Sequence, residues 1–211
     1  MNSKVLVVGI ALAMASPLAA ASDTGFYGAV DVGQSKVKDF CNLSNANLAS
    51  IGVTSLACDD KDTSYRLSLG YKINNNFSVE GGYLDAGKIS GTMAGTYLAT
   101  PYTGRIVSED TEFQFAVIGS IPVADNFSFF GKIGMARWDV TTSVSATVAS
   151  ATAAGSASDT GTDLLWGIGA KYDLNKSIAL RGQFESHKAG NDATTGRGDV
   201  EMLSMGLVFK F

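Results

Sequence analysis

The segment from Tyr65 to Ile73 alternates strictly between apolar and polar side chains, and this period of two is the feature that most restricts the fold. One face carries Tyr65, Leu67, Leu69, Tyr71 and Ile73. Such alternation is typical of a β-strand with one face in an apolar medium and the other in a polar one. Tyrosines at both ends of the apolar set favour a strand that crosses a membrane, with an aromatic residue at each interface.

Seven further segments show the same alternation, and the connections between the segments alternate in length. The segments are 26–33, 77–85, 111–121, 127–138, 163–172, 178–185 and 203–211. Short polar turns are predicted at 74–76, 124–126 and 175–177, and long external segments at 38–62, 86–108, 139–161 and 187–199. Short turns at one end and long connections at the other are typical of outer-membrane barrels. The pattern predicts an all-β fold, an eight-stranded antiparallel transmembrane up-and-down β-barrel.

The composition agrees with a barrel in a membrane. Only 17% of the 211 residues are charged, against about a quarter in soluble domains, and 24 are glycine. No apolar run after Ala21 approaches the roughly 18 residues that a spanning helix needs. A closed barrel pairs every backbone group between strands, which a lipid environment demands. A soluble antiparallel sandwich shares the alternation and turns and is the alternative, but an apolar face on every segment argues against it.

The first residues have the pattern of a secretory signal peptide. Lys4 supplies a positive charge, Val5 to Ala15 are apolar, and Pro17 precedes the small residues at 19–21. We therefore expect a signal peptide at 1–21, a barrel domain at 22–211, and export through the inner membrane to the bacterial outer membrane. A membrane-anchoring helix is the alternative for this segment. The net charge of −4 without a basic stripe predicts no nucleic-acid partner.

Cys41 and Cys58 are the only cysteines, and both lie in the polar segment 38–62. Two cysteines in an exported protein usually pair, so a disulfide is predicted, worth about 3 kcal/mol in the chain-entropy picture. A metal site on these cysteines lacks further ligands, because the single histidine, His187, is distant in sequence. No metal and no cofactor are expected.

Three short motifs resemble the outer-membrane protein A and X family of small barrels. They are Asn76–Tyr83, Phe130–Gly134 and Gly206–Phe211, and the resemblance extends over the whole mature chain. Larger members of that family carry a periplasmic peptidoglycan-binding domain, so a chain ending at Phe211 is expected to be a barrel-only member. The resemblance also implies that the last strand is the assembly signal read by the barrel-assembly machinery. The residues of that signal are Leu203, Met205, Leu207, Phe209 and Phe211. Periplasmic chaperones, outer-membrane lipids and lipopolysaccharide are the other expected partners.

Ten charged residues fall on the face opposite the lipid and are predicted to form a network in the lumen. They are Asp31, Arg66, Lys72, Glu80, Glu112, Lys132, Asp163, Lys171, Arg181 and Glu185. Side chains just fill the interior of an eight-stranded barrel, and buried charges there must pair. Glu80, Lys132 and Arg181 match inward charged positions of the resembled family, where such a cluster closes the lumen and has been discussed as a gate. Lys171 and Asp31 have charges opposite to those expected from the resemblance. A structural core and a narrow ion-conducting pore are both open.

The enzymatic alternative is an outer-membrane lipid hydrolase, and the sequence argues against it. Ser186 and His187 are adjacent, so in a strand they point to opposite faces and cannot form a catalytic pair. We therefore expect no enzyme. The Ser/Ala/Thr-rich segment 139–161 is either an extension of its strands or a mobile loop, and 86–108 carries Tyr97, Tyr102 and Arg105, which suit contact. Analogy with the resembled family implies a surface or host ligand for these segments.

Overall fold

The computed structural model describes residues 24–38, 40–41, 52–191 and 197–211. The predicted signal peptide therefore lies outside the described residues. Within the described ranges the regular structure consists of nine β-strands. No helix among these residues is long and apolar enough to cross a membrane.

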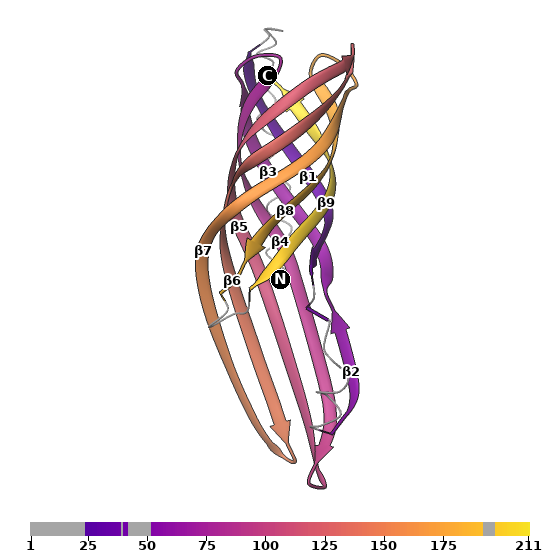
Figure 1. Cartoon of the computed structure of the whole chain (residues 1–211), viewed down its shortest axis with the longest axis vertical. Coiled ribbons are helices and arrows are strands. Elements are labelled where there is room, and N and C mark those ends of the chain that lie inside the picture. Colours follow the sequence, from indigo (N-terminus) through magenta and orange to yellow (C-terminus); the bar gives the residue numbers. More distant parts are fainter. Residues whose placement is uncertain (1–23, 39, 42–51, 192–196) are drawn as a thin grey trace, which may run out of the picture.

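Eight of the strands form a closed antiparallel ring, as predicted, and β2 lies outside that ring (Figure 1). The strands are β1 Gly25–Val37, β2 Val53–Asp59, β3 Lys61–Lys72, β4 Phe77–Tyr97, β5 Thr100–Ala124, β6 Phe127–Val148, β7 Ala151–Asp173, β8 Ile178–Ala189 and β9 Gly198–Lys210. The first and last strands pair with each other, from Tyr27 opposite Lys210 to Val37 opposite Val200. Because each strand pairs with the next around the ring, the barrel itself has no open edge.

The short turns lie at the predicted positions, and they are together at the end of the barrel that is uppermost in Figure 1. The Asn74 side chain accepts hydrogen bonds from the backbone N–H groups of Asn76 and Phe77, both at 2.8 Å. Asn175 does the same for Ser177 at 2.8 Å and Ile178 at 2.9 Å. An asparagine that replaces a missing backbone partner is the chemistry that favours a tight turn at these places.

The outward face of the ring is a continuous apolar band, which on β3 runs from Tyr65 to Tyr71. The side chain of Leu69, in the middle of β3, is 70% exposed, and Ile168 and Met205 are similarly exposed on β7 and β9. Aromatic pairs border the band, with ring centroids 4.9 Å apart for Phe26 and Tyr71. A band of this height with aromatic borders matches the thickness of the outer-membrane hydrocarbon. The polar face of each strand turns inward, as the alternation predicts.

Two of the predicted long external segments are β-hairpins, and the prediction of a loop at 86–108 is wrong. β4 continues to Tyr97 and β5 begins at Thr100, so only Leu98 and Ala99 form the turn, with φ of 48° and 63°. Of the two readings of 139–161, strand extension is confirmed, because β6 and β7 pair up to Val148 opposite Ala151. Segment 38–62 also contains a strand, β2, which pairs with the outer part of β4. The extensions lie beyond the lipid and need no continuous hydrophobic face. Their sequence therefore lacks the apolar–polar alternation that predicts a strand.

Beyond the lipid band, β2, β4, β5, β6 and β7 form one extended sheet, hereafter the external sheet. Figure 1 shows it reaching far past the ends of β8 and β9. β7 pairs with β8 only from Trp166 to Asp173, whereas it pairs with β6 along its whole length. Within the described residues, the stretch Ala151–Ser158 of β7 therefore has a strand partner on one side only. The external sheet ends there in an open edge.

Candidate functional site

Six charged side chains meet across the lumen in a closed ring of alternating sign, hereafter the charge ring. Its members in order are Asp31, Arg66, Glu185, Lys132, Glu80 and Arg181, and each base contacts two acids. They come from β1, β3, β8, β6 and β4, so the ring connects walls on all sides of the barrel. All six residues are at most 5% exposed. Three acids and three bases leave the charge ring electrically neutral.

The contacts within the charge ring are at hydrogen-bond or ion-pair distance. Arg181 Nη1 lies 2.6 Å from Glu80 Oε2, and Arg66 Nε lies 3.0 Å from Asp31 Oδ2. Lys132 Nζ lies 2.5 Å from Glu185 Oε1 and 3.6 Å from Glu80 Oε1. Arg66 Nη1 also contacts Glu185. Buried charges are stable only when paired in this way, because isolated ones would carry a large desolvation cost.

Neutral polar groups connect the charge ring to the layers on either side. Towards the short turns, the Tyr27 hydroxyl donates to Glu80 Oε2 at 3.1 Å. Towards the external end, Gln114 accepts from Arg66 at 3.4 Å and donates to Glu112 Oε2 at 3.0 Å. Glu112 is thus joined to the charge ring through an amide and has no base of the ring as its partner. The lumen is a filled polar core along this length.

A second group of titratable side chains lies at the external side of the charge ring: Asp110, Glu112 and His187, hereafter the acid–histidine cluster. His187 Nε2 contacts Glu112 Oε1, and one potential ligand atom from each residue lies within 4.8 Å of the others. Asp110 and His187 were not among the predicted lumen residues. The alternation could have included them, since Asp110 lies two residues before Glu112, and His187 two after Glu185, on the same inward faces.

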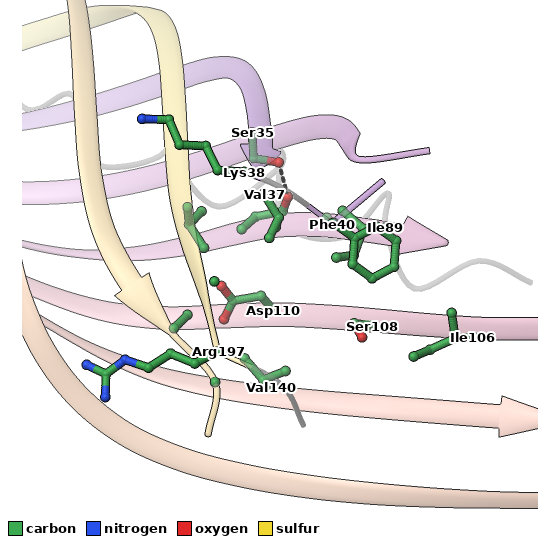
Figure 2. Close-up of a pocket in the computed structure, with 16 residues that line it drawn as sticks. Ser35, Val37, Lys38, Phe40, Ile89, Ile106, Ser108, Asp110, Val140 and Arg197 are labelled. Atoms are coloured by element: carbon green, nitrogen blue, oxygen red, sulfur yellow. Dashed lines mark hydrogen bonds between the residues drawn. The ribbon is translucent and has the colours of Figure 1, made fainter. Parts of the chain in front are cut away.

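An apolar cavity of about 310 Å³ opens from the external mouth and reaches Asp110 (Figure 2). Its walls include Val37, Ile89, Ile106 and Val140. Figure 2 shows Asp110 on β5 among these side chains. The cavity therefore extends from the external mouth to one member of the acid–histidine cluster.

Four of the ten predicted lumen charges lie outside the charge ring: Glu112, described above, and three at the two ends of the barrel. Asp163 is at the external rim, where it pairs with Arg197 at 2.6 Å and accepts a hydrogen bond from Trp138 Nε1 at 3.3 Å. Lys72 is beside a short turn and donates to Asn75 at 2.9 Å. Lys171 lies near the same end, opposite Ser128 on β6. The alternation gives the face of a residue but not its height, so these three were grouped with residues from other levels.

The two remaining predicted features are the disulfide and the relation of Ser186 to His187. Cys41 and Cys58 are joined, with Cα atoms 5.7 Å apart, which confirms the disulfide. His187 points into the lumen towards Glu112, whereas Ser186 lies on the outward-facing row, opposite Trp166 of β7.

Outside the lipid band, the hydrogen bond and the charge of Glu109 raise the pKa of the Lys88 ammonium above its ordinary value.

Comparisons with known proteins give one family and several solved structures. The model of the OmpA-like transmembrane domain matches residues 20–211. The outer membrane protein OprG from Pseudomonas aeruginosa is 11% identical with a TM-score of 0.50, over 92% of this chain and 99% of that one. Neisserial surface protein A is 14% identical with a TM-score of 0.48, over 90% of this chain and 100% of that one. No curated protein sequence matches this chain. At these identities the likeness concerns the fold alone.

Proposed function

We propose that this chain, which belongs to the family of OmpA-like transmembrane domains and is an outer-membrane β-barrel, is a surface protein with a sealed lumen. In this proposal the barrel is an anchor, and the external sheet makes contact with another surface. The observation that carries the proposal is the external sheet itself, in which strands remain paired far beyond the lipid band.

The charge ring supports a structural role for the lumen. Each base bridges two acids, so the ring spans the lumen without an unpaired member that could be released as a gate. Moving one side chain aside would leave each of its two neighbours with a single partner and the buried ring with a net charge, which costs several kcal/mol. A filled, neutral core is thus favoured over the narrow ion path.

The open edge of the external sheet supports a specific mode of contact. From Ala151 to Ser158 the side chains are small and uncharged, with no lysine or proline of the kind that usually protects an edge. The backbone N–H and C=O groups that point away from β6 can pair with an added strand. We propose that the partner is a protein that offers an extended segment to this edge.

The matched test compares two lysine substitutions on neighbouring strands. Ala153 on edge strand β7 lies directly opposite Ala146 on β6, which is paired on both sides. Bacteria of a non-adherent strain expressing the wild type should bind epithelial cell layers above an empty-vector control. Ala153→Lys should reduce this binding, and Ala146→Lys should leave it unchanged. Equal binding by the wild type and the empty vector would contradict the surface-contact proposal, and equal effects of the two variants would contradict the edge.

A second test removes the hairpin as a whole. Thr142 and Ala157 are direct partners, so residues 143–156 can be replaced by Asn-Gly, which forms a two-residue hairpin turn. The shortened protein should still show the heat-dependent gel mobility of a folded barrel and should no longer support adhesion.

A third test concerns the sealed lumen. In planar lipid bilayers the wild type should give no discrete conductance steps. Such steps, lost on substitution of Glu80, would instead support the pore.

The proposal includes three features inferred from the sequence. Export depends on the signal peptide, and assembly depends on recognition of the outward row from Leu203 to Phe211 by the barrel-assembly machinery. Outer-membrane lipids and lipopolysaccharide surround the apolar band. We also propose that the chain is not a lipid hydrolase, which is supported by the opposite orientations of Ser186 and His187. Unchanged lipid A after expression in a suitable host would agree with this.

A further inference from the structure

The acid–histidine cluster differs from the charge ring in its charge balance. The charge ring has three acids and three bases, whereas Asp110 and Glu112 share a single histidine. With His187 neutral the cluster carries two negative charges, and with His187 protonated it still carries one. These charges apply when both carboxyls are ionised. Buried charge without compensation is costly, so this layer of the lumen then requires a further positive charge, either a proton on a carboxyl or a bound cation.

The polar atoms of the cluster also lack hydrogen-bond partners within the described part of the chain. Both carboxylate oxygens of Asp110 are inaccessible to solvent and accept no hydrogen bond. Glu112 Oε1 and His187 Nε2 face each other without hydrogen-bond geometry, although these residues are 1% and 4% exposed. The two Asp110 oxygens, which are buried without a partner beside the Glu112–His187 contact, are the atoms that a cation would bind.

We propose that Asp110, Glu112 and His187 bind a divalent transition-metal ion, with Zn²⁺ as the simplest case. One imidazole nitrogen and two carboxylate oxygens form a ligand set that zinc accepts. Ligand atoms about 2.1 Å from a common tetrahedral ion are about 3.4 Å apart. The present atoms lie within 4.8 Å of one another, so modest side-chain rotation completes the site. Two carboxylates and one divalent ion leave the layer neutral when His187 is neutral.

The surroundings of the cluster fit such a site. Gln114 Nε2 donates to Glu112 Oε2 at 3.0 Å and leaves Oε1 for the ion, which is the role of an orienting residue around metal ligands. The apolar cavity extends from the external mouth to Asp110, and after rotation of the Asp110 side chain it would offer access to the ion and space for a water as fourth ligand. The ion would reach the site from outside the cell and would not need to pass the charge ring.

The direct test measures Zn²⁺ binding to the refolded, EDTA-treated full chain in detergent micelles by isothermal titration calorimetry. The expected result is one ion per chain. Asp110→Asn and His187→Gln should abolish binding, and Gln114→Ala should weaken it about 10- to 100-fold. Glu109→Gln is the matched control, because Glu109 is the adjacent acid on β5 but is exposed and pairs with Lys88. This control should bind as the wild type does.

A second measurement uses only the wild-type chain and therefore does not depend on the folding of any variant. Co²⁺ added to the metal-free protein should produce the intense visible absorption of a four- or five-coordinate ion, and Zn²⁺ should displace it. Absence of this spectrum, absence of Zn²⁺ binding by the folded wild type, or equal binding by Asp110→Asn and Glu109→Gln would overturn the proposal. The cluster would then be neutralised by a proton shared between its carboxylates.

Discussion

Arg181 on β8 holds Asp31 on β1 with two parallel hydrogen bonds, Nε to Oδ1 at 3.1 Å and Nη2 to Oδ2 at 2.6 Å. Between these strands lies only β9, so the pair bridges the seam where the first and last strands of the chain meet. The planar guanidinium fits a carboxylate in this two-pronged way, which an ammonium group cannot do. The charge ring is therefore closed at the point where the barrel itself is closed.

Loss of this arginine should destabilise the barrel strongly. Arg181→Met leaves Asp31 and Glu80 each with one fewer buried base, so the free energy of unfolding should fall by about 3–5 kcal/mol. Urea titration in lipid vesicles, followed by heat-dependent gel mobility, measures the change. Lys88→Met is the control, because it removes an exposed pair with Glu109 and should have no measurable effect. Equal stability of the two variants would show that the charge ring does not hold the barrel together.

A second prediction concerns a glycine that makes room for an aromatic ring. Tyr27 lies over Gly70 of the neighbouring strand, and a Cβ atom at Gly70 would lie 2.1 Å from the tyrosine Cζ atom. Gly70→Ala should displace the ring from its hydrogen bond with Glu80 and destabilise the barrel by about 1–3 kcal/mol. Gly131→Ala is the matched control, because a Cβ there meets nothing within 4 Å. A neutral Gly70→Ala variant would contradict this account.

The sequence predicts the barrel well because the lipid imposes a period of two on every spanning strand. Tyr65–Ile73 shows this most clearly, and the asparagine-rich turns mark where the chain reverses. The external part of β4 to β7 was not predictable in the same way. Its apolar residues, such as Ile89, Ile106 and Val144, do not alternate regularly with polar ones, so the sequence does not distinguish a paired strand from a loop there.

The contents of the lumen were predictable as a set of inward residues but not as contacts. Alternation assigns Asp31, Glu80 and Arg181 to the interior, but only the tilt and register of the strands place them at one level. The same limitation grouped Asp163 with the ring, although it lies at the rim. His187 was considered as a metal ligand only together with the distant cysteines, and the closed ring of strands brings Glu112 to it across the lumen.

A third prediction concerns the position of the apolar band in the membrane. Leu69 is at the centre of the outward row of β3 and is 70% exposed to lipid, so Leu69→Arg should destabilise the barrel by about 2–4 kcal/mol. Ala153→Arg, on the external sheet, should leave the stability in vesicles unchanged. Unfolding curves of both variants check this. A tolerated arginine at 69 would mean that the band does not lie in the hydrocarbon.

The disulfide should stabilise the external end without determining the barrel. Cys41 and Cys58 enclose a short loop, for which the chain-entropy picture gives about 3 kcal/mol. Cys58→Ser should lower the free energy of unfolding by up to this amount, yet the variant should still fold and show heat-dependent mobility. The reduced wild type should behave in the same way. Failure of both to fold would show that the bridge is required for barrel formation.

The last prediction separates a metal ion from a proton as the means of neutralising the acid–histidine cluster. Without a metal ion, an ionised Asp110 would lie beside Glu112 with no hydrogen-bond donor, so Asp110→Asn should then raise the free energy of unfolding by about 1–3 kcal/mol. The amide is neutral and can donate to Glu112. With saturating Zn²⁺ the order should reverse, because a ligand that binds only the folded state stabilises the wild type and not the variant. Equal stabilities in EDTA, unchanged by Zn²⁺, would indicate that Asp110 is already protonated in the folded barrel.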